Sequence, residues 1–148
     1  MFTILVLEDD AELNQTITYA LEKEGYHVLS AYTCRDAEAL LRRASLNLAI
    51  LDVNLPDGDG FGFCSHLKSQ KQVPVLFLSA RDLEEDVLNG YESGADDYVT
   101  KPFSMKILLK KVYVILSRKS PGSMLFDDGF LQVNFELGTV RKGTRECG

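Results

Sequence analysis

A carboxylate that directly follows an apolar run is the first feature of this sequence that could carry chemistry. Residues 46–51 are mostly apolar, Asp52 follows them, and residues 54–60 are rich in Pro, Gly and Asp. A short apolar run bounded by turn residues is typical of a buried strand in a parallel sheet. Open α/β sheets bind their ligands at the carboxyl ends of such strands. Asp52 is therefore the leading candidate for a functional residue.

Two more carboxylates follow a second apolar run. Glu8 and Asp9 come directly after residues 3–7, so parallel strands would bring them to the same edge as Asp52. Three carboxylates at close range repel one another, and a hard divalent cation such as Mg2+ would relieve that repulsion. We expect Asp9 and Asp52 to be direct Mg2+ ligands and Glu8 to act through water. The backbone carbonyl of Asn54 would add a neutral oxygen.

The chemistry that suits this edge is phosphoryl transfer to a carboxylate. An aspartate can form an acyl phosphate as a nucleophile, and because it is ionised at neutral pH it needs no general base. Ser79 and Lys101 follow two further expected strands, so they would reach the same edge. Phosphoryl transfer depends mostly on positioning and charge neutralisation. The ammonium of Lys101, the hydroxyl of Ser79 and Mg2+ would therefore bind oxygens of the transferred group.

The elements that must position these residues alternate between strand and helix. Thr33 with Asp36 is expected to open the second helix, and Gly25 to follow the end of the first. The last helix is expected to be amphipathic, with Ile107 and Leu108 facing inward. The expected strands are 3–7, 27–32, 46–51, 73–78 and 97–100. The expected helices are 11–24, one that opens at 33, 61–69, 83–93 and 105–118.

Five strand–helix repeats imply an α/β fold, because parallel strands need crossover connections. The expected architecture is a doubly wound, five-stranded parallel sheet with helices on both faces. All five strand ends would then lie along one edge. This convergence of several polar residues is a stronger signal than any of them alone.

The pattern changes after residue 118. Residues 119–123 contain Pro, Gly and Ser and are expected to form a linker, and residues 124–148 carry short β-type runs with Asp-Gly and Gly turns. We expect these runs to be a fragment of an antiparallel β-meander, since about 25 residues are too few for a core of their own. The chain would then contain part of a second domain.

Composition excludes several classes of protein. No apolar stretch reaches the roughly 18 residues that span a bilayer, so no membrane association is expected. The formal net charge of −6 disfavours nucleic-acid binding by this chain taken whole. Cys34, Cys64 and Cys147 are odd in number and lack metal-type spacing. They are typical of free thiols in a reducing cytosol, so a cytoplasmic location is expected.

Residues 1–118 resemble the receiver domain of two-component response regulators, with these matching positions: Glu8, Asp9, Asp52, Ser79, Lys101 and Pro102. Residues 94–103 and 51–58, with the β-type runs that follow, are similar to the OmpR/PhoB subfamily in particular. The resemblance implies a flavodoxin-like, CheY-like (βα)5 fold. It also implies that residues 124–148 begin a winged-helix DNA-binding domain, whose helices would come after residue 148.

The resemblance further implies a role for each matching residue. Asp52 would be the phosphoacceptor, which receives its phosphoryl group from a sensor histidine kinase with Mg2+ bound. Lys101 would contact the phosphoryl group, oriented by a cis peptide bond before Pro102. Ser79 and Tyr98 would be a switch pair, in which Ser79 moves toward the phosphoryl group and Tyr98 turns inward. The protein would be a phosphoacceptor and not a turnover enzyme.

The same resemblance places a dimer surface on the fourth helix, fifth strand and fifth helix. Phosphorylation would favour a homodimer through it, and DNA would be bound only by the domain that continues after residue 148. Val87 and Ile107 stand where the subfamily usually has a basic and an acidic residue, so a hydrophobic contact would replace one ion pair. Asp96, Asp97 and Lys111 would supply the other ion pairs.

Other functions fit the sequence less well. A nucleotide-binding oxidoreductase would need a Gly-rich turn after the first strand, where Glu8 and Asp9 stand instead. A carboxylate-dependent phosphohydrolase would usually place its nucleophile after the first strand, and here the candidate Asp52 follows the third. The alternative that remains is a receiver-like protein-binding module regulated without phosphorylation. Such modules commonly lack the acid pair or the lysine, and this chain has both.

Overall fold

The computed structural model describes residues 1–81 and 83–118. The chain divides into two units after Val112, and the sheet and the site described below belong to the unit Met1–Val112. The linker expected at 119–123 and the meander expected at 124–148 lie outside the described residues. Within the part of the chain that is described, no helix is both long and apolar enough to cross a membrane.

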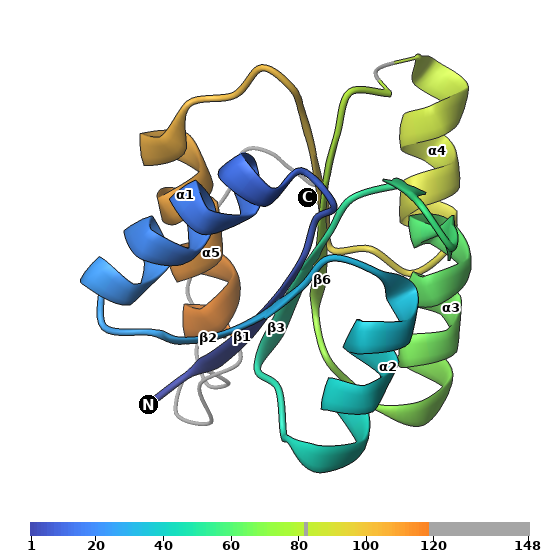
Figure 1. Ribbon diagram of the computed structural model, residues 1–148. Helices are drawn as coiled ribbons and strands as arrows, with labels where there is room; N and C mark the ends of the chain where they lie inside the picture. Colours follow the sequence, from blue (N-terminus) through green and yellow to red (C-terminus); the bar gives the residue numbers. More distant parts are fainter. Residues whose placement is uncertain (82, 119–148) are drawn as a thin grey trace. The chain divides into compact units, whose positions relative to one another are not determined.

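Five parallel strands form the central sheet in the order β2-β1-β3-β6-β7 (Figure 1). They are β1 Thr3–Leu7, β2 His27–Ala31, β3 Leu48–Leu51, β6 Val75–Ser79 and β7 Asp97–Thr100. Every residue of β3 and β6 is buried, as expected for strands covered on both faces. The register pairs Leu7 with both Ala31 and Leu51, so the residues after β1 and β3 emerge side by side.

Helices cover both faces of the sheet. They are α1 Ala11–Lys23, α2 Cys34–Arg43, α3 Gly60–Gln70, α4 Glu84–Glu92 and α5 Met105–Arg118. Figure 1 shows α1 and α5 on one side of the sheet and α2, α3 and α4 on the other. This arrangement confirms the expected doubly wound α/β fold with a five-stranded parallel sheet.

The helix ends follow local rules that the sequence displays. The side chain of Thr33 accepts a hydrogen bond from the backbone N–H of Asp36, which caps α2 as expected. The carboxylate of Asp10 accepts from the first turn of α1 in the same way. Gly25 has a φ of +95°, a conformation that glycine adopts with little strain, and it follows the end of α1.

The loop after Asp52 is more ordered than its composition indicated. Asn54–Leu55 forms β4 and Gly58–Asp59 forms β5, and the two pair as a small antiparallel hairpin. The carboxylate of Asp57, in the turn of this hairpin, accepts hydrogen bonds from the backbone N–H groups of Cys34 and Arg35. The loop that follows the candidate phosphoacceptor is therefore attached to the start of α2.

The expected inward position of Ile107 is wrong. Its side chain is 56% exposed, whereas Leu108 and Val112 are fully buried. Leu108 and Val112 are four residues apart and share one helical face. Ile107 precedes Leu108 by about 100° of helical rotation, so it lies beside the buried stripe and faces solvent.

Candidate functional site

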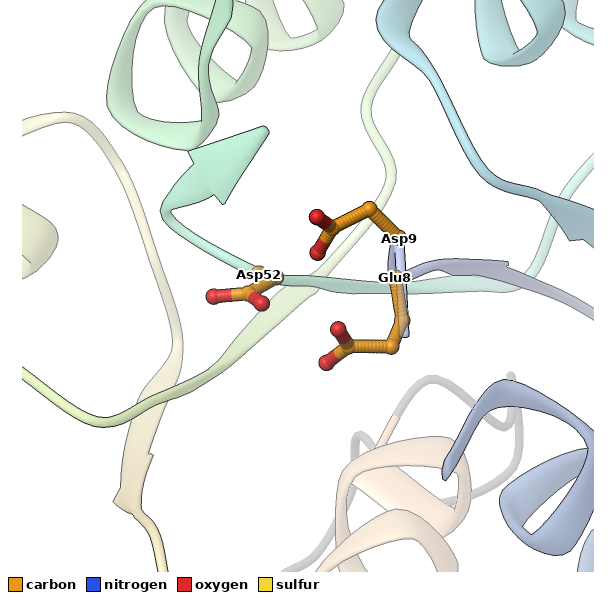
Figure 2. A group of neighbouring side chains, drawn as sticks. All are labelled: Glu8, Asp9 and Asp52. Carbon is orange, nitrogen blue, oxygen red and sulfur yellow. The ribbon is translucent and has the colours of Figure 1, made fainter. Parts of the chain in front are cut away.

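Three carboxylates meet at the carboxyl ends of β1 and β3. Glu8 and Asp9 follow β1, Asp52 follows β3, and one oxygen from each lies within 4.8 Å of the others. Figure 2 shows the side chains of Glu8 and Asp9 both extending toward the side on which Asp52 lies. Glu8 and Asp52 are 2% and 6% exposed, and Asp9 is exposed to solvent. The cluster is therefore buried on one side and open on the other.

The cluster fits a hard cation. Its donors are carboxylate oxygens, which such ions prefer, and Asp9 leaves room for water ligands. Oδ1 of Asp52 accepts hydrogen bonds from the backbone N–H groups of Val53 at 2.6 Å and Asn54 at 3.3 Å. These bonds fix the orientation of the Asp52 carboxylate. The expected role of the Asn54 carbonyl stays a prediction.

Lys101 is the cation that already contacts this cluster. Its Nζ lies 2.9 Å from Oε1 of Glu8 and 3.2 Å from Oδ2 of Asp52. Burial by itself lowers the pKa of Lys101, but the hydrogen bond to Glu8 and the charge of Asp52 outweigh burial and raise that pKa. The peptide bond between Lys101 and Pro102 is cis, the geometry that the family resemblance implies. One ammonium against three carboxylates leaves an excess of negative charge that a divalent cation could balance.

Burial raises the pKa of Glu8 from 4.5 to about 7, and the charge of Asp52 adds to the effect. The hydrogen bonds from Lys101 and from the backbone of Asp10 lower this pKa without cancelling the rise. Glu8 therefore holds its proton more strongly in the folded protein than in the unfolded chain. A cation bound at the cluster would oppose this by favouring the charged form.

The raised pKa of Glu8 predicts a pH-dependent stability in metal-free buffer. Between pH 4.5 and about 7 the folded state binds more protons at Glu8 than the unfolded state does. The free energy of unfolding should therefore fall as pH rises through this range and level off above it. Urea unfolding of the wild type and Glu8→Gln at several pH values checks this. Parallel pH profiles for the two proteins would contradict it.

The two expected switch residues both form hydrogen bonds with the backbone of Arg81. Oγ of Ser79, which is fully buried, accepts a hydrogen bond of 3.1 Å from the backbone N–H of Arg81. The hydroxyl of Tyr98 donates a hydrogen bond of 2.7 Å to the backbone carbonyl of Arg81. Tyr98 is 8% exposed, so its ring points inward. Arg81 thus links the ends of β6 and β7.

The side chain of Arg81 also bridges two loops at this edge. Its Nε and one terminal nitrogen donate to Oδ1 of Asn54 at 3.0 and 2.6 Å. The guanidinium also lies 3.9 Å from a carboxylate oxygen of Asp86 and over the ring of Phe61. Arg81 therefore connects the loop after Asp52 to α4.

Asn14 supports the acid pair, and sequence reasoning missed it. Its side-chain amide is fully buried and donates hydrogen bonds of 3.0 Å to the carbonyls of Glu8 and Ala31. Its Oδ1 accepts a hydrogen bond of 2.9 Å from Ser30. The available signal was an amide on the same helical stripe as Ile17, because a buried polar side chain requires partners.

An apolar recess adjoins the cluster. It is a cavity of about 330 Å³ beside Lys101, and the remaining lining residues are Leu13, Pro102, Phe103 and Met105. These residues come from the start of α1 and from the segment between β7 and α5. The open side of the site therefore has an apolar margin.

The residues expected at a dimer surface have partners within the chain. Lys111 pairs with Asp97 at 2.9 Å, and Asp96 pairs with Lys68 at 3.3 Å. Asp96 also accepts a hydrogen bond from the backbone of Val75. An ion pair between chains would have to share or replace these pairs within the chain. The expected role of these residues in a dimer stays a prediction.

Val87 and Ile107, the apolar residues at two positions where the subfamily usually has charged ones, differ in exposure. Val87 is half-buried and packs against the core, whereas Ile107 is exposed. Leu88 and Tyr91 of α4 are also exposed. The α4 and α5 segments of this unit therefore both present apolar side chains to solvent.

Comparison with known proteins agrees with this geometry. Residues 4–113 match the model of the response regulator receiver domain. The chain is 40% identical over 121 residues to the phosphate regulon transcriptional regulatory protein PhoB of Escherichia coli, covering 80% of this chain and 53% of PhoB. It is 36% identical over 141 residues to the sensory transduction protein RegX3 of Mycobacterium bovis, covering 95% of this chain and 60% of RegX3.

A solved structure shows the same fold. The non-phosphorylated HemR receiver domain of Leptospira biflexa superposes with a TM-score of 0.76 at 37% identity, covering 82% of this chain and 98% of that domain. The chain spans about half to three-fifths of the length of the curated relatives named above. With the family model matching most of its length, this chain belongs to the receiver domain family of two-component response regulators, and its relatives include members of the OmpR/PhoB type.

Proposed function

We propose that this chain accepts a phosphoryl group on Asp52 from a sensor histidine kinase, in a reaction that requires Mg2+. The observation that carries this proposal is that Asp52 lies beside the acid pair and shares the ammonium of Lys101 with Glu8. Its carboxylate is oriented by two backbone N–H groups and contacts the Lys101 ammonium at 3.2 Å. The apolar recess beside Lys101 gives a kinase segment a surface to contact next to the reacting carboxylate.

In the proposed reaction a carboxylate oxygen of Asp52 attacks phosphorus, and the bond between phosphorus and its leaving group breaks. The product is an acyl phosphate on Asp52. Lys101 would move its ammonium from Glu8 and Asp52 to the new phosphoryl oxygens. Mg2+ would be held directly by Asp9 and Asp52, through water by Glu8, and by the Asn54 carbonyl. When bound, it would neutralise charge on the carboxylates and on the phosphoryl group.

Ser79 is proposed to bind another phosphoryl oxygen. Its Oγ accepts from the N–H of Arg81, which leaves its own proton for donation. A shift of Ser79 toward the phosphoryl group would move Arg81, whose backbone carbonyl accepts a hydrogen bond from Tyr98. The change would then reach the face formed by α4, β7 and α5. In this role the chain stores a signal and is not a turnover enzyme.

Phosphate incorporation from acetyl phosphate tests the proposed function. We expect Mg2+-dependent incorporation of a label that alkali or hydroxylamine releases, as for an acyl phosphate, and no incorporation when Mg2+ is withheld. Borohydride reduction should convert the modified aspartate at position 52 to homoserine, which mass spectrometry locates. A folded protein that incorporates no phosphate would favour the alternative, a receiver-like protein-binding module regulated without phosphorylation.

Phosphorylation is proposed to favour a homodimer through the α4–β7–α5 face. Exposed Ile107 and Tyr91 lie on that face, and dimerisation would remove their apolar surface from water. Sedimentation should give twice the mass when beryllofluoride, a phosphoryl mimic, is added with Mg2+. Ile107→Glu should prevent this change. Tyr19→Glu, at an exposed aromatic residue on α1, is the matched control and should dimerise normally.

An identical mass with and without beryllofluoride would contradict dimerisation but leave the phosphoacceptor proposal intact. PhoB is a transcriptional regulatory protein, and this chain covers about half of it. We accordingly propose that the signal controls transcription in the cytoplasm. DNA binding is proposed for a part of the protein other than the unit Met1–Val112.

A further inference from the structure

Helix α4 contains a glycine at the point where it meets the sheet. Gly90 is the one buried residue of α4, and all nine residues of this helix are described. Glycine weakens a helix interior relative to alanine because it loses more conformational freedom on folding. Its φ is not in the left-handed region, so the backbone conformation does not require it. The reason for a glycine here must lie in what surrounds it.

The space beside Gly90 is filled by the ring of Tyr98. A Cβ at position 90 would lie 2.6 Å from Cδ2 and 2.9 Å from Cε2 of Tyr98, closer than real Cβ contacts. The ring of Phe77 packs against that of Tyr98, with the two ring centroids 5.9 Å apart. The same Cβ would be 3.4 Å from Phe77, an ordinary contact. Of these two rings, only Tyr98 would have to move.

The inward ring of Tyr98 holds a connection to the site. Its hydroxyl donates to the carbonyl of Arg81, and the N–H of Arg81 donates to Oγ of Ser79. Displacing the ring would withdraw the donor from the Arg81 carbonyl. Arg81, whose N–H contacts Ser79, would then lose the hydrogen bond to its carbonyl.

We propose that Gly90 is a positioning residue that keeps Tyr98 inward and thereby fixes Arg81 and Ser79. It touches no reacting atom and acts through Tyr98. The proposal rests on the proposed function, in which Ser79 binds the phosphoryl group. A side chain at position 90 would shift Tyr98 outward and weaken the response of the site to a phosphoryl mimic.

Gly62→Ala provides a matched control. Gly62 also lies within a helix, α3, but a Cβ there would meet nothing within 4 Å. Alanine should therefore strengthen α3 without touching the switch residues. Any effect of Gly90→Ala that Gly62→Ala does not share belongs to the contact with Tyr98.

In the first test the tyrosines are labelled with fluorine, and the fluorine NMR resonance of Tyr98 is followed. This resonance is assigned by its absence from the spectrum of Tyr98→Phe. We expect Gly90→Ala to move this resonance toward that of exposed Tyr19, and Gly62→Ala to leave it in place. Urea unfolding gives an independent arm. Gly90→Ala should lower the midpoint in the wild type but not in a Tyr98→Ala background, where the space is open. An unmoved resonance, or an equal loss in both backgrounds, overturns the proposal.

The second test measures the affinity for beryllofluoride with Mg2+. We expect at least a fivefold weaker affinity in Gly90→Ala and no change in Gly62→Ala. Equal affinities in wild type and Gly90→Ala would overturn the positioning role while leaving the proposed function in place. If the wild type itself binds no mimic, the proposed function fails and the link to Ser79 fails with it. The fluorine resonance and the urea unfolding results would then still decide whether Gly90 keeps the ring of Tyr98 inward.

Discussion

Asp52→Asn is expected to abolish phosphate incorporation from acetyl phosphate while leaving the protein folded. Asparagine keeps an oxygen at the position of Oδ1, which can still accept from the backbone N–H groups of Val53 and Asn54. An amide oxygen lacks the charge and nucleophilicity of a carboxylate, so it does not form the acyl phosphate. The variant also loses one carboxylate from the cluster, which removes a charge that raises the pKa of Glu8. Mass spectrometry after incubation with acetyl phosphate and Mg2+ measures the outcome.

Asp59→Asn is the matched control for this substitution. Asp59 is an exposed carboxylate of the same loop that caps α3 through the backbone N–H of Phe61. Asparagine is an equally good cap, so this variant should fold and incorporate phosphate at the wild-type rate. Phosphate incorporation that persists in Asp52→Asn would show that another carboxylate is the phosphoacceptor. Loss in both variants would indicate damage to the loop and would leave Asp52 without support as the acceptor.

Gly60→Ala is expected to destabilise the protein by about 1–3 kcal/mol, the usual cost of forcing extra atoms into a packed site. A Cβ at position 60 would overlap the backbone carbonyl oxygen of Asp52 and lie 2.8 Å from Cα of Val53. Both are main-chain atoms, so no side-chain rotation can make room. The backbone N–H of Gly60 also donates to the carbonyl of Val53 at 2.8 Å. The loop that orients Asp52 would have to shift, and phosphate incorporation should slow with it.

Gly62→Ala should change the stability of the protein in the opposite direction to Gly60→Ala. Its Cβ would meet nothing within 4 Å, so alanine should stabilise α3 by about 0.5–1 kcal/mol. Urea unfolding of the two variants, analysed for midpoint and slope, compares two glycines in one helix. A similar change in stability for both would show that close approach to Asp52 is not what requires glycine at position 60.

The sequence alone determined the alternation of strands and helices and the placement of polar residues at strand ends. These features depend on neighbours in the chain: Asp52 follows an apolar run, Thr33 caps a helix by accepting a hydrogen bond from the N–H three residues later, and Gly25 follows a helix end. Local pattern therefore sufficed to bring the acid pair, Asp52 and Lys101 to one edge. It could not give the strand order β2-β1-β3-β6-β7, because alternation is compatible with several orders of parallel strands.

Only the tertiary structure decided which side chains meet across the edge. The contact of Arg81 with Asn54 and the pairing of Lys111 with Asp97 join residues from different elements. The overlap of a Cβ at Gly60 with Asp52, and at Gly90 with Tyr98, is likewise invisible in the sequence. The physical reason is that close packing depends on the relative placement of whole elements to within a fraction of an ångström, and a local residue pattern carries no such information.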